Sequence, residues 1–159
     1  MIIRQAELKD AEAIAEVWNA EIREGVSTFN SVEKSLSDIQ ALIIARGAGT
    51  QVAYDGARFL GFVTLGAFRG GIGYRFVAEH TIYLTHEAKG RGVGRALMAK
   101  IYDVARDQGL TVLVAGISGE NAAGIGFHTA LGFQETGRMP DIAHKFDRWM
   151  TLVLMQKKL

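Results

Sequence analysis

The segment Thr81–Leu97 reads TIYLTHEAKGRGVGRAL and carries the strongest structural signal in the chain. An apolar run typical of a strand leads into a glycine-rich turn, and the turn opens an amphipathic helix. Gly90, Gly92 and Gly94 let backbone N–H groups converge on an anion without hindrance from Cβ atoms. The start of the helix adds unpaired donors and a positive dipole. The segment therefore predicts a pyrophosphate site built mainly from backbone.

Two known phosphate-binding loops do not fit this segment. A Walker A loop has Lys and then Ser or Thr after its last glycine, but Gly94 is followed by Arg95 and Ala96. A Rossmann turn belongs to an early βαβ unit with an acidic residue about 20 residues further on. Here the turn lies past mid-chain, and the strand expected over 111–117 ends without an acid. From the glycines alone, an ordinary tight turn between a strand and a helix stays open.

The rest of the chain predicts one α+β domain over residues 1–159. Apolar spacing favours helices over 9–24, 32–46, 93–108 and 121–130. Strands are expected near 2–6, 51–54, 59–68, 77–84, 111–117, 133–137 and 149–156, and Asp55-Gly56 predicts a hairpin turn. Because there is no linker and no internal repeat, this order favours a single mixed sheet flanked by helices.

Composition excludes several classes of protein and site. The 159 residues are 48% hydrophobic and 22% charged, with a net charge of +1 and no dense Lys/Arg run, so neither nucleic acid nor a membrane is expected as partner. The absence of cysteine excludes disulfides, thiolate metal ligands and a Cys nucleophile. No residue cluster suggests a metal. Without a signal peptide or a membrane-spanning apolar run, a cytoplasmic location is expected.

Several motifs together resemble the GNAT superfamily of acetyl-CoA-dependent N-acetyltransferases. The stretch Lys89–Gly94 is similar to the family signature Arg/Gln-x-x-Gly-x-Gly/Ala, with Lys at the first position. Asn121, Leu131-Gly132-Phe133 and Met155-Gln156 match further family features in order. The resemblance implies a mixed, mostly antiparallel sheet flanked by helices and splayed between its fourth and fifth strands.

A second set of motifs resembles the phosphinothricin (methionine sulfoximine) acetyltransferase branch. These motifs are Phe68-Arg69, Tyr74-Arg75, Glu79–Tyr83, Phe127-His128, Lys145-Phe146 and Arg148-Trp149. The loop after Arg69 reads Gly-Gly-Ile-Gly, where the branch often has proline. The resemblance implies direct acetyl transfer to an amino-acid-like acceptor, such as phosphinothricin, methionine sulfoximine or methionine sulfone, and a homodimer.

The expected acetyl-CoA site comes from the strand, the turn, the helix after the turn and Asn121. Its members are Ile82, Tyr83, Leu84, Lys89, Gly90, Arg91, Gly92, Val93, Gly94, Arg95 and Asn121. The main chain of 82–84 is expected to pair with the pantetheine amides and to donate to the oxyanion, because the edge of a splayed sheet has free N–H and C=O groups. The side chains of Ile82 and Leu84 are expected in the core.

Glu79 is the candidate general base. It lies on a predicted strand, where an acid is unexpected, and burial there would raise the pKa of its carboxyl group towards neutrality. It would take the proton of the acceptor directly or through a water molecule. The alternative is a structural ion pair with Arg69 or Arg75.

His128 is the second catalytic candidate, seven residues after Asn121. The family resemblance places it near the cofactor sulfur, where an imidazole would protonate the departing thiolate or orient the acetyl group. The alternative is a histidine on the helix surface or one that caps the core.

An amino-acid acceptor brings a carboxylate, which favours arginine because its planar group binds both oxygens. Arg69 and Arg75 flank the glycine-rich loop and are the candidates, with Phe29 and Tyr74 as the apolar wall. The alternative is a pair of solvated loop arginines. The run His144–Trp149 is expected to close the pocket, either within one chain or across a dimer interface. The alternative is that its aromatic residues are simply core or interface residues.

Two other functions stay open. One is a GNAT enzyme with a polyamine, an aminoglycoside or a protein N-terminus as acceptor, against which the pair of arginines argues. The other is an acyl-CoA-binding sensor without catalytic activity, against which the presence of both Glu79 and His128 argues.

Overall fold

Seven strands form one mixed sheet in the computed structural model, which describes residues 1–159. The strand order is β1-β2-β3-β4-β5-β7-β6, and every neighbouring pair is antiparallel except β4 and β5. The strands are β1 Ile2–Gln5, β2 Thr50–Asp55, β3 Arg58–Ala67, β4 Val77–Leu84, β5 Val112–Ser118, β6 Gln134–Lys145 and β7 Arg148–Lys158. The predicted order of elements and the α+β class are confirmed.

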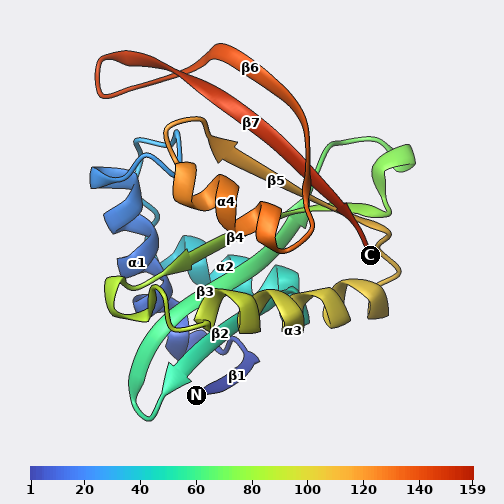
Figure 1. The fold of residues 1–159 in the computed structure, drawn as a ribbon. Coiled ribbons are helices and arrows are strands. Elements are labelled where there is room, and N and C mark those ends of the chain that lie inside the picture. The colour runs from blue at the N-terminus through green and yellow to red at the C-terminus, as the bar shows by residue number, and fades with distance from the viewer.

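The sheet is split between β4 and β5. The two strands pair only where Val77–Glu79 of β4 lie beside Val112–Val114 of β5. Beyond Glu79, β4 continues with β3 as its only partner, while β5 continues beside β7, and the two strands separate (Figure 1). The predicted splay is confirmed, and it leaves the β5-facing edge of residues 80–84 without a partner strand.

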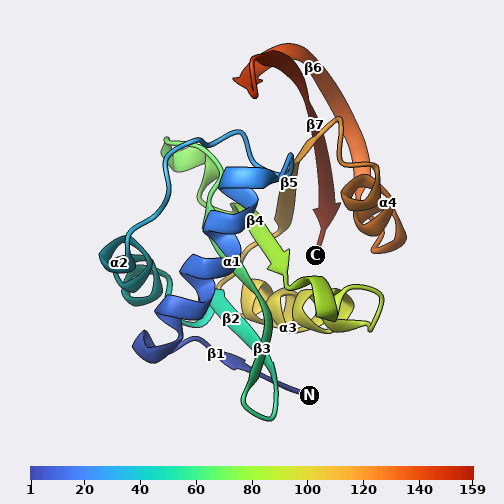
Figure 2. The same ribbon diagram turned by 90° about the vertical axis from the view of Figure 1, so that its left-hand side faces the viewer.

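Helices cover both faces of the sheet (Figure 2). Helices α1 (Ala11–Glu24) and α2 (Leu36–Arg46) lie on one face, and α3 (Val93–Asp107) and α4 (Ala122–Ala130) lie on the other. Helix α2 begins at Leu36 and not near residue 32 as predicted. The reason is a capping box, in which Ser35 and Asp38 each accept a hydrogen bond from the other's backbone N–H.

The apolar residues divide into two cores because side chains alternate across each strand. Val52 and Phe62 point to α1 and α2, while Ala53 and Val63 point to the opposite core, where α3 packs. All four side chains are completely buried. Each face of the sheet is therefore held against its own helices. No helix is both long and apolar enough to cross a membrane.

The last two strands form a long hairpin, whereas two short strands near 133–137 and 149–156 were predicted. Strand β6 extends to Lys145 and β7 begins at Arg148. The two-residue turn consists of Phe146 and Asp147, with φ values of 54° and 55°. Residues other than glycine rarely adopt a positive φ, and no glycine or asparagine marks the turn in the sequence. The hairpin was therefore missed.

Candidate active site

The glycine-rich turn has the conformation that an anion cradle requires. Gly90 and Gly92 adopt φ values of 75° and 78°, and Gly92 is the N-cap residue of α3. The carbonyl of Gly92 accepts the first helical hydrogen bond, from the N–H of Ala96 at 3.0 Å. The N–H groups of the first turn, at residues 93–95, therefore have no partner within the helix. This arrangement fits a diphosphate group, and Lys89 lies at its edge.

Gly94 has a packing role as well. A Cβ atom at this position would lie 3.1 Å from the ring of Phe127 on α4 and 3.3 Å from Cδ1 of Leu84 on β4. A Cβ atom here would push these side chains back by a few tenths of an ångström, so the glycine favours the close approach of α3 to both elements. The side chains of Ile82 and Leu84 pack against the larger core, as the sequence predicts. The guanidinium group of Arg91 lies 3.3 Å from the carboxylate of Asp55.

A cavity of about 720 Å³ occupies the splay, between β4, β5, α4 and the loop that joins α1 to α2. It begins at the glycine-rich turn and ends beside the α1–α2 loop. Of the predicted site residues, it is lined by Phe29, Glu79, Ile82, Tyr83, Leu84, Lys89, Gly90, Asn121 and His128. Residues separated by up to a hundred positions in the chain are thus brought together in one cavity.

Glu79 lies at the inner end of the splay. It is the last residue of β4 that pairs with β5, and its side chain is half-buried in the cavity wall. Its carboxylate lies over Gly116 of β5, because a Cβ atom on that glycine would be 2.8 Å from Oε1. Burial alone raises the pKa of the Glu79 carboxyl group, with no contribution from a neighbouring charge. The alternative ion pair with Arg69 or Arg75 is not formed.

Both ring nitrogens of His128 have protein partners. Nδ1 lies 2.7 Å from the carbonyl oxygen of Gly124, one turn earlier in α4, and Nε2 lies 2.9 Å from Nε2 of His80 on β4. Each of the two residues is only 6% exposed. Burial lowers the pKa of both histidines, that of His80 to about 3. His80 was not singled out from the sequence, although it directly follows Glu79.

Asn121 connects α4 to the α1–α2 loop. Its Oδ1 accepts a hydrogen bond from the N–H of Gly124 at 2.8 Å and so caps the helix. Its Nδ2 donates to Oγ of Ser27 at 3.1 Å. Ser27 and Thr28 also line the cavity and were not predicted.

Lys145, at the end of β6, holds the same loop. Its ammonium group donates to the carbonyl oxygens of Gly25 at 2.7 Å and Thr28 at 2.9 Å, and the residue is only 5% exposed. The sequence indicates that the run 144–149 closes the pocket. In the structure Lys145 holds the loop that carries Phe29, while Trp149 is 63% exposed.

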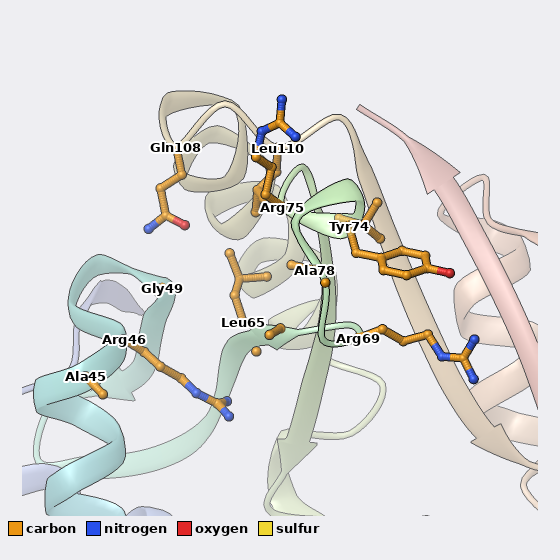
Figure 3. Close-up of a pocket in the computed structure, with 14 residues that line it drawn as sticks. Ala45, Arg46, Gly49, Leu65, Arg69, Tyr74, Arg75, Ala78, Gln108 and Leu110 are labelled. Atoms are coloured by element: carbon orange, nitrogen blue, oxygen red, sulfur yellow. The ribbon is translucent and has the colours of Figure 1, made fainter.

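The three acceptor residues predicted on the β3–β4 loop line a different cavity. Arg69, Tyr74 and Arg75 border a space of about 390 Å³ together with Arg46 of α2. In Figure 3 the guanidinium group of Arg75 points upward, whereas those of Arg46 and Arg69 both point to the lower right, from different elements. Arg75 donates to the carbonyl of Ile72 at 3.0 Å. The structure therefore does not bring these residues to the cavity that contains Glu79.

The arrangement of residues can be tested against a metal ion and against acetyl-CoA. No group of three or more His, Cys, Asp and Glu side chains could hold a metal ion. The residues do fit acetyl-CoA, because the backbone cradle at the start of α3 continues into a cavity along the free edge of β4. A split mixed sheet with this cradle beside the gap defines a protein of the acyl-CoA-binding type.

Comparison with known proteins identifies the family. An acetyltransferase (GNAT) domain matches residues 3–154. The chain is 37% identical to an L-methionine sulfoximine/L-methionine sulfone acetyltransferase of Pseudomonas paraeruginosa, over 99% of this chain and 94% of that protein. It is 35% identical to the L-amino acid N-acyltransferase MnaT of Escherichia coli, over 100% and 94%.

A solved structure agrees. The phosphinothricin acetyltransferase of Sinorhizobium meliloti, in complex with acetyl-CoA, superimposes with a TM-score of 0.93 at 31% identity, over 99% of this chain and 88% of that one. The chain belongs to the GNAT family and is an N-acetyltransferase that uses acetyl-CoA.

Proposed function

We propose that the protein transfers the acetyl group of acetyl-CoA to the amino group of an amino-acid-like molecule of the phosphinothricin, methionine sulfoximine or methionine sulfone type. Transfer is direct, in a ternary complex. The observation that carries the proposal is the single cavity that joins the half-buried Glu79 to the free edge of β4 and to the glycine-rich turn. The named activities of the relatives support this class of acceptor.

The cofactor is held largely by main chain. The N–H groups at the start of α3 bind the diphosphate, and Lys89 and Arg95 add positive charge. Arg91 adds charge as well once its guanidinium group exchanges Asp55 for the diphosphate. The edge of Ile82–Leu84 pairs with the pantetheine amides, and Asn121 lies on the opposite side of the cavity. When bound, acetyl-CoA supplies an acetyl group that is activated as a thioester.

Glu79 acts as the general base. Its carboxylate removes a proton from the ammonium group of the acceptor, directly or through a water molecule, so that the amine can attack the thioester carbonyl. The raised pKa of the carboxyl group favours this proton transfer. An N–H group of β4 stabilises the negative charge that develops on the acetyl oxygen. The C–S bond then breaks, and CoA leaves as a thiolate that takes up the second proton of the acceptor nitrogen through water. The products are the amide and CoA, and Glu79 releases its proton to solvent. His128 contributes by orienting the wall of the cavity beside the thioester, since both its ring nitrogens are engaged.

The acceptor lies beside Phe29, which forms an apolar wall of the cavity. Arg69 or Arg75 binds the acceptor carboxylate, with Tyr74 beside them. Because these three residues border the neighbouring cavity, this part of the proposal requires the glycine-rich loop over 69–76 to rearrange when the acceptor binds.

The protein acts as a homodimer in the cytoplasm, where acetyl-CoA is available. Support for the dimer comes from the β6–β7 hairpin, which exposes Ile142, Phe146 and Trp149. Size-exclusion chromatography with light scattering tests it. Twice the chain mass is expected, with a shift to one chain mass in Trp149→Glu. A wild-type monomer at micromolar concentration contradicts it.

The decisive experiment measures thiol release from acetyl-CoA with methionine sulfoximine, methionine sulfone, phosphinothricin, free amino acids, spermidine, kanamycin and a peptide N-terminus as acceptors. Turnover with the sulfoximine-like compounds, retained in Glu87→Gln and lost in Glu79→Gln, is the expected result. Turnover of only spermidine, kanamycin or the peptide would show that the acceptor is not amino-acid-like but belongs to the class of the compound that is acetylated. Binding of acetyl-CoA without turnover of any acceptor would favour the sensor.

A further inference from the structure

His80 stands at the point where the sheet divides. Backbone pairing between β4 and β5 ends at Glu79 and Val114, and His80 is the next residue along β4. Helix α4, which carries His128, packs on β5 and β6, in the other half of the sheet. The contact between Nε2 of His80 and Nε2 of His128, at 2.9 Å, therefore spans the gap at the first position without a backbone ladder.

One carbonyl group determines where the protons of this pair lie. The oxygen of Gly124 can only accept, so Nδ1 of His128, at 2.7 Å, carries a hydrogen atom. In the neutral ring Nε2 of His128 is then an acceptor, and Nε2 of His80 must donate to it. Nδ1 of His80 is buried and makes no hydrogen bond of normal geometry, although the backbone of Val114 on β5 lies close enough to the ring to oppose part of the lowering of its pKa.

The surroundings of the pair keep it uncharged. The ring of Phe133 lies 5.4 Å from that of His80 and 5.2 Å from that of His128, between centroids. Phe127 packs edge-on against His128 at 5.1 Å. Burial in these apolar surroundings lowers the pKa of both histidines. A neutral N–H···N hydrogen bond is therefore the state of the pair at physiological pH.

We propose that His80 is a positioning residue whose hydrogen bond to His128 closes the inner end of the splay and sets the width of the pantetheine slot. The slot lies between the backbone of Ile82–Leu84 on β4 and the side of α4 that carries Asn121 and Gly124. The hydrogen bond joins these two walls directly, so its length determines how far apart they stand. The inference rests on the acetyl-CoA slot of the proposed function, but not on the identity of the acceptor.

The first test uses the unmodified protein. Long-range ¹⁵N–¹H spectra of the imidazole rings distinguish a protonated, pyrrole-type nitrogen from a bare, pyridine-type one. We expect pyrrole-type Nδ1 and pyridine-type Nε2 in His128, and the reverse in His80. Nε2 atoms of the same type in both rings, either both pyrrole-type or both pyridine-type, would overturn the proposal, because no hydrogen bond could then join His80 to His128.

The second test compares His80→Leu, which removes the donor, with His80→Gln, which keeps an N–H donor at a similar reach. Calorimetric titration with CoA is expected to show a Kd about tenfold higher in the Leu variant, which corresponds to about 1.4 kcal/mol. The Gln variant is expected to recover most of this loss, and His86→Gln, on an exposed turn, to bind like wild type. The KM for acetyl-CoA should rise with the Kd, while the KM of the acceptor stays unchanged.

A purely structural role of His80 would lower the melting temperature without changing the Kd for CoA. A folded His80→Leu variant that binds CoA with wild-type affinity therefore refutes the proposal. If His80→Leu does not fold, the His80→Gln titration and the ring spectra decide, since both use folded protein. If no acceptor is acetylated, the proposed function is refuted. The Kd for CoA and the ring spectra do not depend on turnover, so they still test the role of His80.

Discussion

The ammonium group of Lys145 donates a 2.9 Å hydrogen bond to the carbonyl oxygen of Thr28, 117 positions earlier in the chain. A second bond, of 2.7 Å, goes to the carbonyl of Gly25. The β6–β7 hairpin thus holds the α1–α2 loop, which places Phe29 in the wall of the cavity. A buried ammonium group requires such acceptors, and here they belong to the loop that would contact the acceptor.

Replacing Lys145 by Met is expected to weaken acceptor binding, because the loop loses its support while the apolar volume is kept. We expect the acceptor KM to rise about tenfold, by loss of charge-assisted hydrogen bonds worth about 1.5–3 kcal/mol each, with the KM for acetyl-CoA unchanged. Steady-state kinetics with each substrate varied provide the measurement. An equal rise of both constants would mean that Lys145 supports the whole fold and not this loop. Lys157→Met, which removes another lysine that bonds a backbone carbonyl, serves as the control.

The activity is expected to fall at acidic pH. Burial raises the pKa of Glu79 above its ordinary value of 4.5, and only the ionised carboxylate can accept a proton. The value of kcat/KM should therefore decline as the pH drops through this raised pKa, with a midpoint above pH 4.5. A pH profile of the wild type, compared with that of any residual activity of Glu79→Gln, checks this. The same acidic limb in the Gln variant would assign it to another group.

Gly92→Ala is expected to weaken CoA binding as well as stability. Gly92 has a φ of 78°, and an alanine there costs about 1–2 kcal/mol. Gly56→Ala, in the β2–β3 turn with a φ of 60°, introduces the same strain far from the cradle and is the matched control. Both variants should melt at lower temperature, but only Gly92→Ala should bind CoA more weakly. If the two variants bind CoA with equal affinity, the positive φ of Gly92 is not needed for binding the diphosphate.

The buried histidines are expected to make the fold sensitive to acid. In the unfolded chain a histidine has a pKa of about 6.5, whereas the pKa of folded His80 is lowered to about 3. As the pH falls below about 6.5, the unfolded chain binds protons that the folded chain does not. The stabilising contribution of the two buried histidines is therefore fully present above about pH 6.5 and is lost as the pH falls towards the folded pKa.

For each such histidine the unfolding free energy should fall by up to about 1.4 kcal/mol per pH unit. Urea unfolding between pH 7 and 4 measures the slope. We expect a shallower slope in His80→Gln than in the wild type and in the exposed control His86→Gln. Three identical slopes would mean that other groups cause the loss of stability.

The parts of this protein that depend on nearby residues could be predicted from the sequence. Strand β4 was predicted at its observed bounds, and helix α3 to within one residue, since the apolar spacing and the glycines before Val93 are local signals. The anion cradle could be predicted for the same reason, because it is formed by the backbone of successive residues. The start of α2 was misplaced, although the capping pair Ser35 and Asp38 is visible in the sequence.

Contacts between distant residues were decided only by the tertiary structure. The pairing of His80 with His128 joins positions 48 apart, and that of Lys145 with Thr28 joins positions 117 apart. The turn at Phe146 and Asp147 has positive φ values without glycine, so no local preference predicts it. Arg69 and Arg75 flank the loop before Glu79 but border another cavity, since the direction of a side chain depends on its packing partners. The sequence by itself determined the chemistry available to this protein, and the packing of the two halves of the split sheet decided which groups meet.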